Sequence, residues 1–111
     1  MPYRFGDVVL LDYPFTDASG SKRRPGLVLL TEEDGDILFA RITSKERAGE
    51  FDVSLREWEH VGLAYPSIVR LSKMVSLHRN LALREIGQLS ETDKEAVLQL
   101  LQYLVQSMRN Y

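Results

Sequence analysis

The residues best suited to chemistry are three consecutive cations, Lys22, Arg23 and Arg24, which stand directly before Pro25 and an apolar run. Proline restricts the residue before it to extended conformations, so Arg24 has few backbone options at the entrance to a predicted strand. A guanidinium held in this way presents a planar fork of donors that suits a phosphate group. The competing interpretation is a solvated basic loop that only keeps a sheet edge from aggregating.

Two hydroxyl residues, Thr43 and Ser44, follow another predicted strand. Side chains at a strand end can position a ligand, although Ser and Thr beside a loop more often cap the backbone. Arg41 and Arg70 interrupt apolar runs, and strand alternation turns each to the face opposite its immediate neighbours. Each arginine is therefore either a surface residue or one that points into a groove.

Aromatic and titratable side chains offer fewer leads. Phe51 and Trp58 could stack on nucleobases, although packing in a core or an interface is the commoner use of aromatic residues. The two histidines, His60 and His78, stand in no triad or metal-ligand spacing. The chain has no cysteine and its carboxylates are scattered, so we expect neither a thiolate nucleophile nor a bound metal.

Length and composition are those of an ordinary globular domain, with 111 residues, 44% hydrophobic and 27% charged. We expect one domain over residues 1–111. The sequence shows no N-terminal signal segment and no apolar run of membrane-spanning length, so we expect a soluble, cytoplasmic protein. A formal net charge of -2 argues mildly against bulk nucleic-acid binding, but a local group of cations can attract an anion even on an acidic protein.

Apolar runs and turn signals predict a mostly antiparallel sheet. The predicted strands cover residues 6–15, 25–31, 37–43, 51–55, 67–71 and 73–77, with exposed loops at 16–24 and 44–50 and a hairpin turn at Asp34-Gly35. We expect one helical turn within 56–66, closed near Gly62, and a short helix or turn within 78–90 that ends near Gly87.

The clearest element is a terminal amphipathic helix. Ser90 and Asp93 match a capping box, and acidic residues in the first turns suit the helix dipole. Apolar residues then recur three and four positions apart at Val97, Leu101, Leu104 and Met108, with Leu98 and Val105 beside them. This face must bury against a sheet or a partner, and the whole pattern predicts a small antiparallel barrel or curled sheet with helical decoration.

The ordered set of segments resembles the MazF/PemK family of toxin endoribonucleases. In GDVVLLDYPFTDASGSKRRPGLVLL (6–30), Gly-Asp leads a first strand, and a polar loop and Arg-Pro precede the next strand. ARITSK (40–45), FDVSL (51–55) and PSIVRLSKMVSL (66–77) are similar to the family's Thr-Ser segment, its following strand and its late strand pair. A terminal helix completes a resemblance that covers nearly the whole chain in order.

This resemblance implies a mainly β fold of the α+β class, a small SH3-like antiparallel β-barrel with a C-terminal amphipathic helix. It implies a homodimeric toxin of a type II toxin–antitoxin system that cleaves single-stranded RNA, normally mRNA, at specific sequences without a metal or cofactor. Attack of a ribose 2′-OH on the adjacent phosphate would leave a cyclic phosphate and a 5′-OH. The implied partners are RNA and a cognate antitoxin whose tail occupies the RNA groove.

The two positions most associated with catalysis in the family fall on Arg24 and Thr43. Arg24 would stabilise charge on the phosphorane, and Thr43 would orient the phosphate or the 2′-OH. The residues expected to bind RNA are Lys22, Arg23, Ser44, Phe51 and Arg70.

One residue departs from the pattern of some family members. Where an aspartate two residues beyond the late-strand arginine serves as base, this chain has Ser72, which leaves the general base unassigned. A catalytically impaired RNA- or antitoxin-binding module is therefore the alternative function. A structural dimerisation domain is the third interpretation. The Leu-rich helix face supports association under all three interpretations, so it does not discriminate among them.

Overall fold

The computed structural model describes residues 3–14, 20–44 and 47–110, and its strands form one six-stranded sheet. The elements, in chain order, are β1 (Asp7–Pro14), β2 (Ser21–Thr31), β3 (Asp36–Thr43), β4 (Asp52–Ser54), α1 (Trp58–Val61), β5 (Ile68–His78), the 3₁₀ turn η1 (Arg79–Leu81), β6 (Ala82–Gln88) and α2 (Glu91–Arg109). Phe15 of the first predicted strand range, residues 16–19 of the first predicted loop and residues 45–46 of the second lie outside the described residues.

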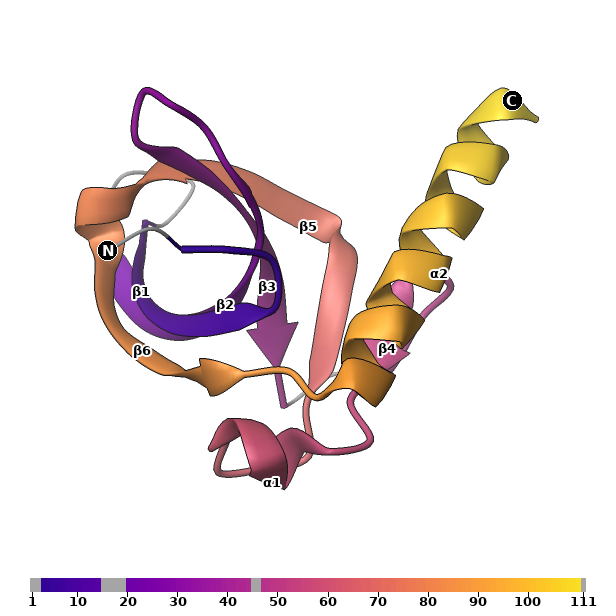
Figure 1. Cartoon of the computed structure of the whole chain (residues 1–111), viewed down its shortest axis with the longest axis horizontal. Coiled ribbons are helices and arrows are strands. Elements are labelled where there is room, and N and C mark those ends of the chain that lie inside the picture. Colours follow the sequence, from indigo (N-terminus) through magenta and orange to yellow (C-terminus); the bar gives the residue numbers. More distant parts are fainter. Residues whose placement is uncertain (1–2, 15–19, 45–46, 111) are drawn as a thin grey trace.

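The sheet has the order β4-β5-β3-β2-β1-β6, and every neighbouring pair is antiparallel. It curls strongly around itself, with α2 beside β5 and α1 beneath the sheet in the view of Figure 1. The predicted mostly-β antiparallel fold with a C-terminal helix is confirmed. The edge strands β4 and β6 do not pair with each other within the described residues, so a closed barrel stays a prediction.

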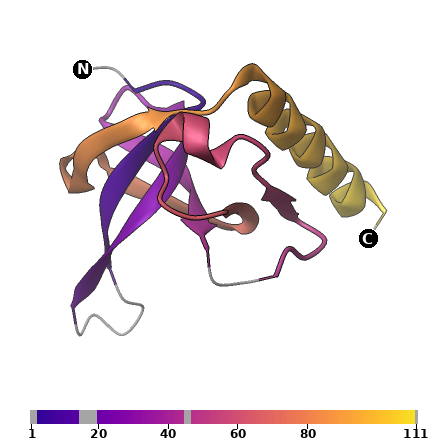
Figure 2. The same ribbon diagram turned by 90° about the horizontal axis from the view of Figure 1, so that it is seen from below.

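β2 begins at Ser21, four residues before the predicted strand start at Pro25. Backbone pairing with β1 extends it, because Tyr13 lies opposite Lys22 and Asp12 lies opposite Arg23. A ladder needs only a backbone partner, so polar residues can continue a hairpin that the apolar pattern does not mark. The paired ends of β1 and β2 project beyond the rest of the sheet in Figure 2. The prediction of an exposed loop was therefore wrong for Lys22 to Arg24, which lie on a strand.

The two predicted strands at 67–71 and 73–77 are one continuous strand, β5. Its pairing with β3 jumps between Ala40, which faces Met74, and Arg41, which faces Arg70. The residues between form a bulge, and bulges bend a strand without ending it. The bend is visible in Figure 1 and lets β5 pair with β3 on one side and β4 on the other.

The segment predicted as a short helix or turn within 78–90 contains only the turn η1, followed by strand β6. His78 Nδ1 accepts the Asn80 N–H (3.1 Å) at the start of that turn. β6 pairs with β1 through two register shifts, and its charged middle is tolerated because an edge strand faces solvent. Gly87 is not a helix end: a Cβ there would lie 2.0 Å from the Val61 carbonyl oxygen, so glycine lets α1 approach β6.

Both predicted helix-terminus signals are confirmed. Gly62 ends α1 with φ 102°, in the left-handed region that glycine adopts without strain. At the start of α2, Ser90 Oγ accepts the Asp93 N–H (3.2 Å). The Asp93 carboxylate departs from the capping-box pattern, because it accepts the N–H groups of Arg56 and Glu57, each at 2.9 Å. Fully buried, it fastens the segment before α1 to the start of α2.

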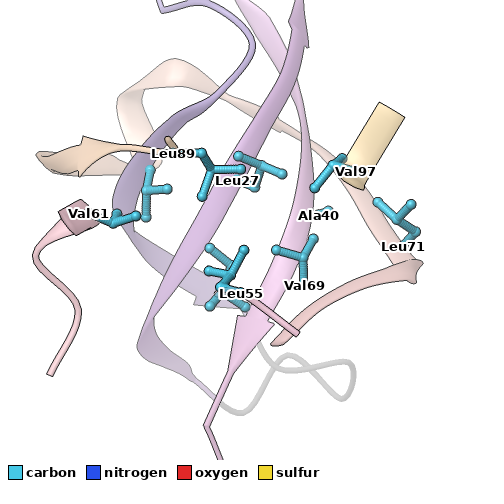
Figure 3. Close-up of a cluster of buried hydrophobic side chains, with 10 residues drawn as sticks. Leu27, Ala40, Leu55, Val61, Val69, Leu71, Leu89 and Val97 are labelled. Atoms are coloured by element: carbon cyan, nitrogen blue, oxygen red, sulfur yellow. The ribbon is translucent and has the colours of Figure 1, made fainter. Parts of the chain in front are cut away.

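Alternating strand residues build two buried hydrophobic clusters. One gathers residues of the sheet with Val61 of α1 and Val97 of α2, as Figure 3 shows. The other contains Val9, Leu11, Val28, Ile37 and Phe39. Along β2, Leu27 belongs to the first cluster and Val28 to the second, as expected when successive side chains point to opposite faces.

α2 buries only part of its apolar face. Val97 is fully buried, whereas Leu98, Val105 and Met108 are 42%, 51% and 62% exposed. Glu95, Leu98, Leu101, Gln102 and Val105 line a shallow groove along the helix. Within the described part of the chain, no helix combines the length and apolar character needed to cross a membrane.

Candidate functional site

A cavity of about 310 Å³ lies where β2 begins, β3 ends and the segment before β5 passes. It is called the cationic cavity here, and its lining is Lys22, Arg23, Arg24, Pro25, Ile42, Thr43, Ser44, Leu63, Ala64, Tyr65 and Ser67. Five of the predicted site residues therefore meet in one place: Lys22, Arg23, Arg24, Thr43 and Ser44. Four of them come from β2 and β3, which are adjacent in the sheet, and Ser44 directly follows β3.

The register between β2 and β3 explains why Arg24 and Thr43 meet. The last recorded pair toward this end joins Gly26 to Arg41. Continued by two residues in the antiparallel sense, the same register puts Arg24 opposite Thr43. Side chains at opposing positions share a face of the sheet, and Thr43 is only 7% exposed there. The Arg-Pro and Thr-Ser pairs, separate in the sequence, thus form one wall.

Gly26, two residues beyond Arg24 on β2, carries no side chain toward the second hydrophobic cluster. A Cβ at this position would stand 2.5 Å from Leu11 Cδ1 and 3.4 Å from Phe39 Cδ1. Leu11 and Phe39 are fully buried members of the second hydrophobic cluster. The absent side chain lets this cluster pack directly beneath the strand that carries Arg24.

Arg24 is half-buried and lies in the electrostatic range of Arg41 and Tyr13. Burial lowers the pKa of its guanidinium, the repulsion of Arg41 lowers it further, and Tyr13 opposes both effects. Burial likewise raises the pKa of Tyr13, against the attraction of Arg41 and Arg24. Arginine stays protonated in proteins, so these effects describe a fixed charge whose hydration is already reduced. Such a charge is well placed to receive an anion.

The segment before β5 also lines the cavity, through Leu63, Ala64, Tyr65 and Ser67, and the sequence did not predict it. Ser67, 8% exposed, donates its hydroxyl to the Tyr65 carbonyl (2.7 Å), and its own carbonyl accepts the Leu55 N–H (3.0 Å). Tyr65 is 67% exposed at the cavity. In the sequence, this segment is marked only by Tyr-Pro-Ser before a strand. That motif does not indicate which other strands the segment will lie beside.

Phe51 and Arg70 lie outside the cavity lining. The Arg70 Nε pairs with Asp52 Oδ1 (3.3 Å), whose side chain is 2% exposed. The Phe51 ring contacts that of Tyr103 on α2, with centroids 5.9 Å apart. Tyr103 also donates its hydroxyl to Glu50 (2.5 Å), and this bond raises the pKa of Tyr103. Both predicted residues therefore have structural partners near the end of the β3–β4 loop.

Ser72, at the position of the family aspartate, is an exposed residue of β5. The carboxylate beside Arg70 comes instead from β4, because Asp52 and Arg70 are paired across the two strands. Asp52 also accepts the Gly49 N–H (2.7 Å). It is thus engaged in holding the loop before β4.

The described residues that could group around a metal ion are Glu32, Asp34 and Asp36, with carboxylate oxygens within 4.8 Å of one another. They lie at the turn between β2 and β3, and none of them lines the cationic cavity. Asp34 already accepts the Asp36 N–H (2.9 Å) as part of the turn. Exposed acidic groups in a turn do not by themselves define a metal site.

Comparison with known proteins identifies the family. Residues 4–105 match the model of the PemK-like, MazF-like toxin of type II toxin–antitoxin systems, and the chain belongs to this family. No curated protein matches the chain in sequence.

Solved structures share the fold over almost the whole chain. An endoribonuclease from a mycobacterial species has a TM-score of 0.74 at 14% identity, covering 96% of this chain and 93% of that one. A MazE–MazF complex from Deinococcus radiodurans has a TM-score of 0.75 at 22% identity, covering 96% and 98%. A mycobacterial endoribonuclease in complex with its cognate antitoxin has a TM-score of 0.69 at 16% identity, covering 96% of each chain. At these identities the likeness shows a common fold.

Proposed function

We propose that the protein is the toxin of a type II toxin–antitoxin system and acts as a metal-independent, sequence-specific endoribonuclease on single-stranded RNA, most naturally mRNA. The observation that carries the proposal is the cationic cavity, in which Arg24 and Thr43 meet with Lys22, Arg23 and Ser44. Family membership and the endoribonucleases that share the fold support it.

The reaction that suits this arrangement is internal transfer of a phosphodiester. A ribose 2′-oxygen forms a bond to the adjacent phosphorus while the bond to the 5′-oxygen of the next nucleotide breaks. The 2′-OH gives up its proton and the leaving 5′-oxygen gains one, so the products are a 2′,3′-cyclic phosphate and a 5′-OH. Arg24 stabilises the added charge on the phosphoryl oxygens, and Thr43 orients the phosphate or the 2′-OH.

Metal independence is supported by the chemistry of the cavity walls. Its described lining offers cations, hydroxyls and apolar groups, with no carboxylate, imidazole or thiol among them. Hard divalent cations are held chiefly by carboxylates, and the fixed positive charge of Lys22, Arg23 and Arg24 repels them. In this proposal the guanidinium takes the electrostatic role that a metal ion has in other nucleases.

The remaining residues expected to bind RNA divide into two groups. Lys22, Arg23 and Ser44 are exposed at the cavity and contact the phosphates around the cleaved bond. For Phe51 and Arg70 we propose contacts farther along the strand, because both lie outside the lining. Single-stranded RNA suits such a site, because its unstacked bases are free to be read.

The proposed partners are the cognate antitoxin and a second copy of the chain. An acidic antitoxin tail is the natural occupant of the cationic cavity, where it would exclude RNA. Homodimer formation would cover the exposed apolar residues of α2, and light scattering of the purified protein at micromolar concentration tests it; a monomer would contradict it. The cytoplasm, where mRNA is translated, is the proposed location.

One observation favours the alternative of a catalytically impaired RNA- or antitoxin-binding module. Ser72 stands where some family members carry a catalytic aspartate, and the carboxylate of Asp52, which pairs with Arg70, is buried. Under this alternative the cavity binds RNA without cutting it.

A cleavage assay on long single-stranded RNA with the purified chain separates the two functions. Arg24→Ala is expected to lower the cleavage rate by about 10²–10³-fold, the cost of removing one preorganised donor from an oxyanion site. Arg84→Ala, which removes an exposed arginine of β6 outside the cavity, is the matched control and is expected to cut like the wild type. A folded Arg24→Ala variant that cuts at the wild-type rate would refute the assignment. RNA binding without cleavage by the wild type would favour the alternative.

A further inference from the structure

We propose that Tyr65 is a platform on which a nucleobase next to the cleaved bond stacks. This inference rests on the proposed function and adds to it how the substrate is held. Tyr65 lines the same cavity as Arg24 and Thr43. It is the most exposed large apolar side chain of the described residues, at 67%.

The environment of Tyr65 contrasts with that of the other strongly exposed tyrosine. Tyr103 is 47% exposed, yet its hydroxyl bonds Glu50 and its ring contacts Phe51. Within the described ranges, the Tyr65 side chain takes part in no hydrogen bond or ring contact, and only its backbone carbonyl is engaged. Among the described residues the ring therefore has neither of the partners that hold Tyr103, and it lines the proposed site.

The backbone beneath this ring is fixed from three directions. Pro66 confines Tyr65 to extended conformations. The Ser67 hydroxyl donates to the Tyr65 carbonyl (2.7 Å), and the buried Ser67 is tied in turn through its carbonyl to the Leu55 N–H (3.0 Å). A side chain displayed on a rigid backbone loses little conformational freedom when it binds a ligand. The backbone that carries the exposed ring is thus already ordered before a ligand binds.

Charge defines what that partner is. The lining that includes Tyr65 also includes Lys22, Arg23 and Arg24, which suit phosphate. A ligand that uses both features of this lining combines an anionic group with a flat apolar surface, and a nucleotide has both. Single-strand-binding sites pair a cationic track with aromatic platforms in this way, since every base has a π-face.

The test uses a short single-stranded RNA that carries one mapped cleavage site, and kcat/KM as the readout. Alanine replacement of a stacking aromatic is expected to lower kcat/KM by roughly 10- to 100-fold. Tyr65→Phe keeps the ring and should stay near the wild type, whereas Tyr65→Leu keeps apolar bulk without a π-face and should behave like Tyr65→Ala. Leu83→Ala, at an exposed apolar residue of β6 outside the cavity, is the control for surface change and should match the wild type.

A second substrate series identifies the stacked base. One nucleotide on either side of the cleaved bond is made abasic in turn. At one of these positions, removal of the base should lower kcat/KM of the wild-type enzyme by the same factor as the Tyr65→Ala substitution does with the intact substrate. With the Tyr65→Ala enzyme, removal of that base should cause no further loss of kcat/KM. Losses that multiply at both positions would overturn the stacking contact.

The outcomes separate the two proposals. If Arg24→Ala is inactive but Tyr65→Ala stays within twofold of the wild type, the stacking proposal fails and the proposed function stands. If the wild type neither binds nor cuts single-stranded RNA, both fail. Melting temperatures equal to that of the wild type are expected for the Tyr65 variants, because the side chain is exposed.

Discussion

At the scale of single residues, Arg24 is constrained in both its backbone and its charge. Pro25 limits its backbone, the β1–β2 ladder fixes its position opposite Leu11, and partial burial reduces the hydration of its guanidinium. The sequence predicted the chemistry of this residue, because the Arg-Pro restriction is local. It did not predict the neighbours Arg41 and Tyr13, because their approach depends on strand pairing.

The planar fork of Arg24 gives a prediction that separates geometry from charge. Arg24→Lys keeps the positive charge but loses the two parallel donors that match phosphate oxygens. We expect kcat/KM for RNA cleavage to fall at least about 10-fold, between the wild type and Arg24→Ala. A lysine variant as active as the wild type would show that Arg24 acts only as a point charge.

The second wall of the site shows the limit of sequence reasoning at the residue scale. Thr43 and Ser44 were predicted because they follow an apolar strand and resemble a family motif. Tyr65 and Ser67 were missed, because they reach the cavity of Arg24 only after the chain has passed through β4 and α1. Phe51 and Arg70 were selected by resemblance, and the structure places them with Tyr103 and Asp52 instead of in the cavity.

At the scale of elements, the site depends on how α1 and its flanking segments are held. The Asp93 carboxylate, completely buried in α2, accepts the N–H groups of Arg56 and Glu57 just before α1. The chain then runs through α1 to Leu63 and Tyr65 of the cavity wall. The start of the terminal helix thereby supports a wall of the site without touching it.

Asp93→Ala should therefore destabilise the fold markedly. It leaves two partly buried N–H donors without their acceptors, at a cost of roughly 1–3 kcal/mol for each. Urea unfolding is the measurement, with a lower midpoint at an unchanged m-value as the expected result. Glu91→Ala removes an exposed carboxylate from the same helical turn and should change the free energy of unfolding by less than about 1 kcal/mol. Equal stability of the two variants would show that the Asp93 bonds contribute little.

Element type was predictable where the signals were local. The Ser90 cap, the Gly62 end of α1 and the Asp34-Gly35 turn were all read from a few adjacent residues. The errors occurred where tertiary pairing decides: β2 is lengthened by β1, β5 continues through a bulge, and β6 is a strand because β1 offers it an edge. Composition alone gave no sign of these partners.

At the scale of the whole molecule, charge is distributed unevenly. The chain carries a formal net charge of -2, yet Lys22, Arg23 and Arg24 converge on one cavity, while Glu32, Asp34 and Asp36 gather at the other end of β2. This separation directs a polyanion to the cavity and away from the acidic turn. Affinity for RNA should accordingly fall with salt, with a slope set by the few phosphates contacted and not by net charge.

The most direct test of the central claim is the chemistry of the product ends. Wild-type protein and Arg24→Ala are incubated with a long single-stranded RNA in excess EDTA, and the fragments are analysed for their termini. We predict cuts at a short recurring sequence, with 2′,3′-cyclic phosphate and 5′-OH ends from the wild type, and cleavage slower by about 10²–10³-fold from the folded variant. Fragments with 5′-phosphate ends, or cleavage that EDTA abolishes, would contradict a metal-free attack by the ribose 2′-OH at a phosphate held by Arg24.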